Sequence, residues 1–255
     1  MENLEKFYIN GRWVTPNSTE TMPVSNPATE QKIGRITLGN GTDVDRAVTA
    51  ALTAFEEFSQ TSKAQRLSLL LRLKSVTEAR FEDLAQAMRL EMGAPISMAR
   101  SDQADAAVGH LQGFIDALEK LEEQITLASG DVLVREPIGV CGLITPWNWP
   151  MNQIVLKVVP ALATGSCCIL KPSEHTPISA MIYAEIIDEA GYPPGVFNLV
   201  NGDGPTVGAA LSRHADIQMM SFTGSTRAGI AVTQDAAPTV KRVTLELGGK
   251  SPNLV

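Results

Sequence analysis

From Val140 onward, short apolar runs rich in β-branched residues alternate with longer segments of helical periodicity. This alternation is typical of βαβ units that build a parallel sheet. The pattern predicts five strands: Val140–Ile144, Cys167–Lys171, Val196–Val200, Gln218–Phe222 and Arg242–Glu246. Helical segments are expected between them, near Pro150–Thr164, Pro177–Ala190, Pro205–Ser212 and Ser225–Gln234. The predicted fold class is therefore α/β, with an open parallel sheet and flanking helices.

Proline and glycine support two of these helices. Pro150 and Pro177 each suit the first position of a helix, where the missing N–H costs nothing. Gly165 and Gly191 stand where the same two helices are expected to end.

Before the sheet the pattern is mainly helical. One helix is expected to start at Thr42 and Asp43, and Ser62 with Gln65 resembles a capping box that opens a second. A third is expected from about Ile96 to Lys120. We expect all three to cover one face of the sheet.

Periodicity lapses between Glu122 and Arg135. Within this stretch Gly130-Asp131 precedes the alternating run Val132-Leu133-Val134, which predicts a β-hairpin that protrudes from the domain.

Unusual polar clusters follow each predicted strand. They are Thr145-Pro146-Trp147-Asn148, Lys171-Pro172-Ser173-Glu174, Gly202-Asp203-Gly204-Pro205, Thr223-Gly224-Ser225-Thr226 and Glu246. Open parallel sheets bind their ligands outside the carboxyl ends of the strands. The sequence therefore predicts one ligand site at this edge.

Several of these residues have two interpretations. Glu246, between two leucines and before a Gly-Gly turn, is either a general base or a strand-terminal glutamate that faces water. Asn148 either donates its amide to a developing oxyanion or caps the helix near Pro150. Lys171 and Glu174 could equally form a surface i,i+3 ion pair, and Lys157 either snorkels to the surface or assists the cofactor region.

The segment Gly224-Ser225-Thr226-Arg227-Ala228-Gly229 follows a strand and opens a helix. Its first backbone N–H groups can therefore face a pyrophosphate. It departs from the usual G-x-G-x-x-G fingerprint of dinucleotide-binding turns.

Composition limits the classes of partner. The chain has 255 residues, of which 44% are hydrophobic and 19% charged, and a formal charge of -7, which argues against nucleic acid and against an anionic membrane surface. The start, Met1-Glu2-Asn3-Leu4-Glu5-Lys6, lacks the regions of a signal peptide. The most apolar helix, Ile154 to Leu162, is interrupted by Lys157 and is too short to span a membrane. We expect a cytoplasmic protein.

The cysteines and histidines carry no predicted chemistry. Cys141, Cys167 and Cys168 lie in apolar strands and are expected to be reduced core residues. His110, His175 and His214 are isolated and lack metal-ligand spacing, so we expect no metal.

The ordered motifs after the strands, with Tyr8-Ile9-Asn10-Gly11-Arg12-Trp13 and Asn26-Pro27-Ala28-Thr29 before them, resemble the aldehyde dehydrogenase family over nearly the whole chain. The chain looks like the amino-terminal half of such an enzyme, without the nucleophilic cysteine, so we expect it to be inactive alone. The resemblance implies a Rossmann-like fold and four segments: 1–121, the amino-terminal part of the NAD-binding domain; 122–138, a bridging hairpin for oligomer contacts; 139–247, the remaining NAD-binding domain; and 248–255, the start of a truncated catalytic domain.

By this resemblance the full-length enzyme oxidises an aldehyde with NAD⁺ through a cysteine thioester. Asn148 would stabilise the oxyanion, and Glu246 would activate water, which favours a carboxylic-acid product. Glu174 favours NAD over NADP, because a carboxylate accepts hydrogen bonds from a 2′-hydroxyl and repels a 2′-phosphate. The implied partners are a small-molecule aldehyde and further copies of the chain, as a homodimer or homotetramer. The implied cofactor-binding residues are Thr145, Pro146, Trp147, Asn148, Lys171, Ser173, Glu174, Gly204, Gly208, Phe222, Thr223, Gly224, Ser225, Leu247 and Gly248.

The helix that starts at Pro150 presents one stripe made of Trp149, Asn152, Gln153 and Leu156. In the resembled family this face lines the aldehyde tunnel. Two of the four residues, Asn152 and Gln153, are amides, and a long aliphatic aldehyde would leave them short of hydrogen-bond partners. We therefore expect a small or polar aldehyde, with an aromatic or hydroxyl group that Trp149 can cover.

Two other classes stay open. One is a non-catalytic cofactor-binding fragment. The other is a relative of the acyl-phosphate reductases, against which Glu246 and Asn148 together argue.

Overall fold

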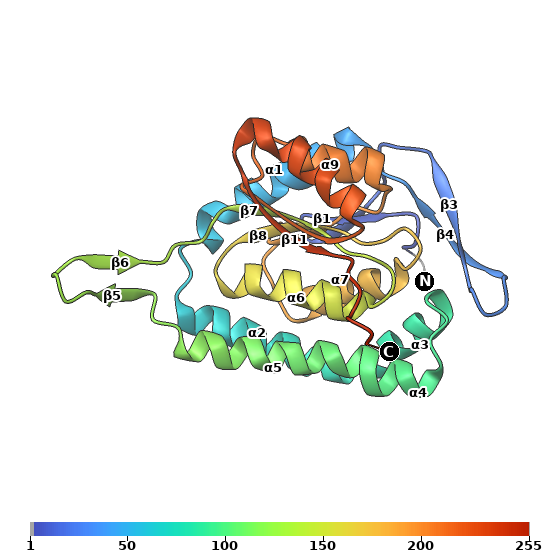
Figure 1. Ribbon diagram of the computed structural model, residues 1–255, viewed down its shortest axis with the longest axis horizontal. Helices are drawn as coiled ribbons and strands as arrows, with labels where there is room; N and C mark the ends of the chain where they lie inside the picture. Colours follow the sequence, from blue (N-terminus) through green and yellow to red (C-terminus); the bar gives the residue numbers. More distant parts are fainter. Residues whose placement is uncertain (1–2, 255) are drawn as a thin grey trace.

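The computed structural model describes residues 3–254, and Figure 1 shows how its helices and strands are layered around one central sheet. Met1, Glu2 and Val255 lie outside this range, so the outer ends of the predicted segments 1–121 and 248–255 do too. The boundaries of the four segments stay a prediction.

The central sheet has seven strands. In spatial order they are β11 (Arg242–Leu247), β10 (Met219–Gly224), β7 (Val140–Ile144), β8 (Cys167–Lys171), β9 (Phe197–Leu199), β1 (Phe7–Ile9) and β2 (Arg12–Val14). The first five are parallel, as the sequence predicts, and β1 and β2 extend the sheet with antiparallel pairings. The predicted α/β fold is confirmed.

The two added strands were missing from the prediction. A tight turn at Asn10 and Gly11 joins them, and both residues have positive φ angles, 54° and 72°. Consecutive positive φ values define the hairpin turn that Asn-Gly favours. Phe7, Tyr8 and Ile9 are all buried, so β1 belongs to the core of the sheet.

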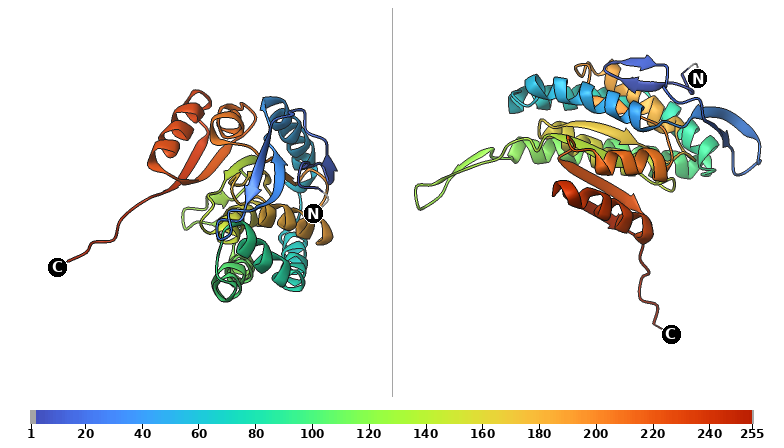
Figure 2. Two further views of the ribbon diagram at one scale, coloured as in Figure 1. Left: turned by 90° about the vertical axis from the view of Figure 1, so that its right-hand side faces the viewer. Right: turned by 90° about the horizontal axis from the view of Figure 1, so that it is seen from above.

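The helices form three layers (Figures 1 and 2). One face of the sheet is covered by α1 (Gly41–Phe58), η2 (Gly204–Gly208), α8 (Ala209–Arg213) and α9 (Thr226–Ala236). The other is covered by α6 (Pro150–Ala163) and α7 (Ile178–Glu189). Outside these lie α2 (Lys63–Ala79), α3 (Phe81–Glu91) and the continuous run of α4 (Ile96–Met98), η1 (Ala99–Ala104) and α5 (Asp105–Lys120). The short η3 (Ala237–Thr239) follows α9.

The expectation that all three amino-terminal helices cover one face is wrong. Only α1 packs on the sheet, whereas α2 and α5 pack against α6 and α7 on the opposite side. The reason is that α6 is apolar on most of its surface and is buried by the sheet on one side and by outer helices on the other. Lys157 is buried with it.

Local signals predicted most helix ends. The capping box is present, because Ser62 Oγ accepts from the N–H of Gln65 and Gln65 Oε1 accepts from the N–H of Ser62. Pro150 occupies the first turn of α6, but Pro177 precedes α7 and is its N-cap residue. The predicted start of α7 is therefore one residue too early.

Two antiparallel hairpins stand apart from the central sheet. One pairs β3 (Thr21–Ser25) with β4 (Lys32–Thr37), and the other pairs β5 (Gln124–Thr126) with β6 (Val132–Val134). The second projects far from the body of the molecule, as Figure 1 shows at its left. The protruding hairpin that the sequence predicts is confirmed.

Candidate functional site

The predicted polar clusters lie at one edge of the parallel sheet. Strands β11, β10, β7 and β8 are neighbours in that order, and their registers pair Glu246 with Thr223 and Ile144 with Lys171. Because the strands are parallel, their carboxyl ends meet at this edge. The structure thus brings the candidate residues together, and the roles given to them stay predictions.

Asn148 lies in the loop between β7 and α6, and it is exposed. The N-cap residue of α6 is Trp149, and within the described chain no side chain caps this helix. The interpretation of Asn148 as a helix cap is therefore wrong. Its amide can donate to a ligand in the edge.

Glu246 is exposed near the end of β11, next to the half-buried Leu245. Exposure suits a base that must activate water, and it suits equally a glutamate that merely faces solvent. Leu247 packs over Gly229, where a Cβ atom would come within 2.7 Å of the leucine side chain. This contact holds the end of β11 against α9.

Lys157 lies beneath this edge, on the side of α6 that faces the sheet. Lys157 is 7% exposed, and its Nζ donates to Ser221 Oγ over 3.0 Å. Burial lowers the pKa of Lys157 to about 8, and the charge of Glu246 opposes this shift. Lys157 therefore does not snorkel to the surface, and it interacts electrostatically with the candidate base.

Lys171 is enclosed at the end of β8. Its ammonium group donates to the carbonyl oxygens of Gly202 and Pro172, at 2.6 and 2.9 Å, and to Glu174 Oε2 at 3.3 Å. Burial lowers the pKa of Lys171, and Glu174 opposes the shift. The side chain is 4% exposed, so the pair is not a surface ion pair. These acceptors use all three N–H groups of the ammonium.

Glu174 remains accessible to a ligand. Its side chain is 25% exposed, and one carboxylate oxygen is held by Lys171. Among the described residues no group donates to the other oxygen, Oε1, which can accept from a hydroxyl. Beside it, Ser173 Oγ accepts from the N–H of His175 over 3.3 Å and tightens the turn.

A cleft of about 520 Å³ lies between η2, α8 and α9. Three of the predicted cofactor residues, Gly204, Gly208 and Phe222, line it. An ion pair between Arg213 and Asp235, at 2.9 Å, joins α8 to α9 across it. Mostly apolar walls with a few polar groups are typical of small-molecule sites.

Two buried hydroxyl groups at the edge have no partner in the described chain. They are Oγ1 of Thr145, which follows β7, and Oγ1 of Thr223, near the end of β10. A buried hydroxyl without a hydrogen-bond partner raises the free energy of the fold, and a polar ligand that bonds to it would lower that energy. Next to them, Ser225 caps α9 by accepting from the N–H of Ala228. The first N–H groups of α9 stay free for an anion.

Gly224 joins β10 to this cap, and a side chain there would displace the ring of Phe222. A Cβ atom there would lie 2.5 Å from the ring of Phe222, which lines the cleft. Pro146 is half-buried, Trp147 is 57% exposed, and Gly248 has open space around it. No contact of these last three identifies a role.

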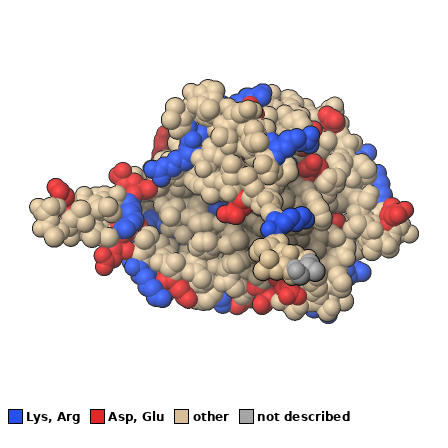
Figure 3. Space-filling view, viewed as in Figure 1, with Lys and Arg blue, Asp and Glu red and all other residues tan. Residues whose placement is uncertain are grey.

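The predicted tunnel stripe lies on the accessible side of α6. Trp149, Asn152 and Gln153 are half-buried and Leu156 is 39% exposed, whereas the opposite stripe is buried. Figure 3 shows that charged side chains are sparse on the face where α6 lies and that this face is hollowed. His110 of α5 lies 2.6 Å from Asn152 Oδ1, so it is not isolated.

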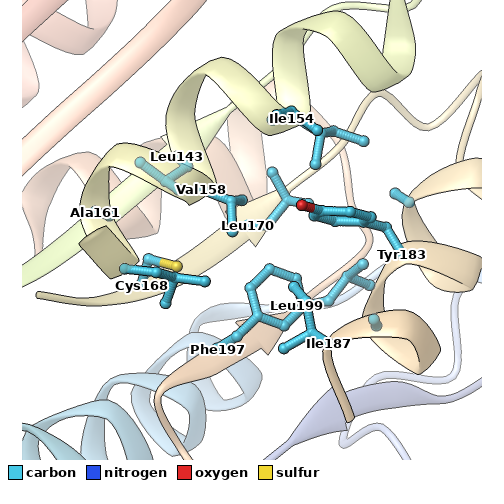
Figure 4. Packing of buried hydrophobic residues seen from close by; sticks show 14 of the residues in the cluster. Leu143, Ile154, Val158, Ala161, Cys168, Leu170, Tyr183, Ile187, Phe197 and Leu199 are labelled. Atoms are coloured by element: carbon cyan, nitrogen blue, oxygen red, sulfur yellow. The ribbon is translucent and has the colours of Figure 1, made fainter. Parts of the chain in front are cut away.

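The three cysteines are core residues. Cys168 lies among Leu170, Phe197 and other apolar side chains, as Figure 4 shows. Burial raises the pKa of Cys141 and of Cys167 to about 12, and raises that of Cys168 as well. None of them suits a nucleophile, because the thiolate is the reactive form.

Sequence reasoning missed three residues around the site. His110 and Ser221 give no local signal, because their partners lie 42 and 64 positions away. Glu91, which is fully buried, accepts from the N–H groups of Ile178 and Ser179 and from Ser179 Oγ. It thereby caps α7 from another helix. Burial raises the pKa of Glu91 to about 7, and these hydrogen bonds oppose the shift.

Within residues 3–254 no cluster of three or more His, Cys, Asp or Glu side chains could hold a metal ion. In the same range no helix combines the length and the apolar character needed to cross a bilayer.

Comparison with known proteins gives one consistent result. The profile described as the aldehyde dehydrogenase family matches residues 13–255. The chain is 53% identical over 256 residues to a 3-succinoylsemialdehyde-pyridine dehydrogenase of a Pseudomonas species. The match covers all of this chain and 54% of that protein. The chain thus spans about half the length of the curated relatives it matches.

Solved structures agree. One is a mutant of aldehyde dehydrogenase C from Pseudomonas syringae in complex with NAD⁺ and octanal, with a TM-score of 0.97 and 52% identity over 99% of this chain and 52% of that one. Another is the NAD⁺ complex of an aldehyde dehydrogenase from Bacillus cereus, with a TM-score of 0.94 and 38% identity over 99% of this chain and 53% of that one.

Proposed function

Because this chain belongs to the aldehyde dehydrogenase family, we propose that it forms part of an enzyme that oxidises an aldehyde to a carboxylic acid with NAD⁺. By the intact enzyme we mean this chain continued to the length of its relatives. One observation carries the proposal: Asn148, Glu174 and Glu246 lie at one edge of the sheet. The hydroxyl groups of Thr145 and Thr223, which have no partner in the described chain, are buried at the same edge.

The residues at the edge suit a dinucleotide. The free carboxylate oxygen of Glu174 would accept from a ribose hydroxyl, while Lys171 holds its other oxygen. The N–H groups that open α9 after Ser225 would hold the pyrophosphate, and the cleft at Gly208 and Phe222 would take the adenine ring. NAD⁺ bound at these residues would be the hydride acceptor of the reaction.

The residues of this chain then supply two further steps. The amide of Asn148 stabilises the oxyanion that forms when a thiolate adds to the aldehyde. Loss of hydride leaves a thioester, which Glu246 hydrolyses by taking a proton from an attacking water. The thiolate belongs to a cysteine outside these residues, because Cys141, Cys167 and Cys168 are buried and weakly acidic.

The aldehyde would lie along Trp149, Asn152, Gln153 and Leu156. The names of the two relatives point to different aldehydes, a succinoyl semialdehyde of pyridine and octanal. The two amides on this stripe support a polar aldehyde for the present protein.

The β5–β6 hairpin supports assembly into a homodimer or homotetramer. Leu127, Val132, Leu133 and Val134 expose 41 to 58% of their surface on it. A lone two-stranded hairpin is marginally stable in water, and clustered exposed apolar residues mark contact surfaces. A second copy of the chain would cover them.

The test is NADH formation by the intact enzyme with a panel of aldehydes, together with identification of the acid product. We expect turnover with at least one aldehyde, and a drop in kcat of about 100- to 1000-fold in Asn148→Ala. Absence of NADH with every aldehyde tested would refute the proposal. Retention of full kcat in Asn148→Ala would refute the role of the amide.

A further inference from the structure

A carboxylate from another helix caps α7. The helix begins at Ile178, and its N-cap residue, Pro177, has no side chain that can accept a hydrogen bond. The N–H groups of Ile178 and Ser179 donate instead to Glu91, a 3% exposed residue at the end of α3. Ser179 Oγ donates to the same carboxylate over 2.5 Å. A residue 87 positions away in the sequence thus holds the start of α7.

This cap fixes the place of α7 relative to α3. The first N–H groups of a helix have no partner within the helix, and a negative charge is favoured at that end. Because Glu91 is buried, water does not replace its carboxylate when the helix moves away, and the N–H groups would be left without a partner. The start of α7 is therefore held in one position.

The turn that carries Glu174 ends at this cap. Residues 172–177 form the turn and join β8 to α7. At the strand end the turn is fixed by Lys171, whose ammonium group donates to Glu174 and to the carbonyl oxygen of Gly202. At the helix end it is fixed by Glu91. The direction of the Glu174 carboxylate therefore depends on both anchors.

We propose that Glu91 is a positioning residue for the cofactor, which sets the preference for NAD⁺ over NADP⁺ by holding the turn that carries Glu174. The proposal rests on the proposed function. Glu91 is buried and acts only through Glu174, whose carboxylate accepts from a 2′-hydroxyl and repels a 2′-phosphate. Hydrogen bonds weaken steeply when donor and acceptor are misaligned. A turn released at its helix end therefore loses affinity for NAD⁺ and excludes NADP⁺ less strongly.

The experiment measures the ratio of kcat/KM for NAD⁺ and for NADP⁺ in the intact enzyme with one aldehyde. The variants are Glu91→Gln, Glu174→Gln and the two combined. Glu91→Gln keeps the size of the side chain and one acceptor oxygen, but it places an amide donor against the N–H groups of α7.

Two controls separate positioning from general loss of stability. Ser179→Ala removes one hydroxyl donor and leaves both backbone hydrogen bonds to Glu91 in place. Ser62→Ala removes the side-chain cap of α2, a helix that carries no cofactor candidate.

We expect Glu91→Gln to lower the ratio about three- to tenfold, mainly through a higher KM for NAD⁺, and to leave kcat with NAD⁺ within about twofold. In the Glu174→Gln background the same change should have no further effect, because both residues act through one carboxylate. Both controls should keep the ratio within about twofold of the unchanged enzyme.

An unchanged ratio in Glu91→Gln, or an equal drop with and without the Glu174 carboxylate, would overturn the proposal while leaving aldehyde oxidation intact. The same follows if Ser62→Ala lowers the ratio as much, or if Glu174→Gln leaves it unchanged. If the unchanged enzyme oxidises no aldehyde with either cofactor, the proposed function itself fails.

Discussion

The ammonium group of Lys157 donates to the hydroxyl oxygen of Ser221 over 3.0 Å, inside the molecule. The bond ties α6, which follows the oxyanion candidate Asn148, to β10. Glu246 lies on the neighbouring strand and favours the charged lysine. A buried lysine, carried by the helix that follows Asn148, thus lies close enough to Glu246 to feel its charge.

The pKa of Lys157 should respond to Glu246. Burial favours the neutral amine and lowers the pKa to about 8, whereas the carboxylate favours the ammonium and raises it. Glu246→Gln removes only the second effect, so the pKa should fall below that of the unchanged chain. NMR titration of the lysine Nζ resonance measures it, with Lys157→Met for assignment. An unchanged or higher pKa would show that the two groups do not interact.

Glu246→Gln should separate the two stages of the reaction in the intact enzyme. Hydride transfer precedes hydrolysis, so one burst of NADH per active site should remain while steady turnover falls strongly. Rapid mixing with NAD⁺ and an aldehyde measures both phases. Loss of the burst together with turnover would assign Glu246 a structural role.

Glu174→Gln should narrow the preference for NAD⁺ over NADP⁺. The variant removes the charge that repels a 2′-phosphate but keeps an oxygen that accepts from a 2′-hydroxyl. The ratio of kcat/KM for the two cofactors should therefore drop, mainly through KM. Glu122→Gln, on the exposed segment before β5, controls for the loss of one negative charge. A constant ratio would refute the ribose assignment.

The sequence predicted the parallel strands because their signals are local. Apolar runs and helical periodicity recur along the chain, and parallel connection then brings the strand ends together. It missed β1 and β2, although the Asn10-Gly11 dipeptide is a strong hairpin signal, because two short strands carry little periodicity of their own.

Contacts between distant segments were beyond sequence reasoning. The partners of Lys157 and His110 lie on other elements, and nothing at either position indicates them. The layer to which α2 and α5 belong was also mispredicted, since amphipathic periodicity shows that a face is buried but not against what.

Glu91 should prove essential to the start of α7. Its carboxylate accepts from two backbone N–H groups, at Ile178 and Ser179, and from one hydroxyl. Glu91→Ala leaves these donors buried and unpartnered, which should cost about 2–3 kcal/mol of unfolding free energy. Glu57→Ala, at an exposed position of α1, is the matched control and should cost less than about 0.5 kcal/mol. Chemical denaturation measures both, and equal costs would contradict the capping role.

The β5–β6 hairpin should determine the oligomeric state of the intact enzyme. Val132 and Val134 alternate with Leu133 on β6, and all three are exposed, so whichever face meets another copy offers apolar contacts. A charge there must be desolvated on association. Val134→Glu should therefore shift the protein to a smaller species in light scattering coupled to size-exclusion chromatography. Leu71→Glu on α2, a leucine that is 53% exposed, is the control and should leave the mass unchanged. If Val134→Glu also leaves the mass unchanged, the hairpin is not an assembly surface.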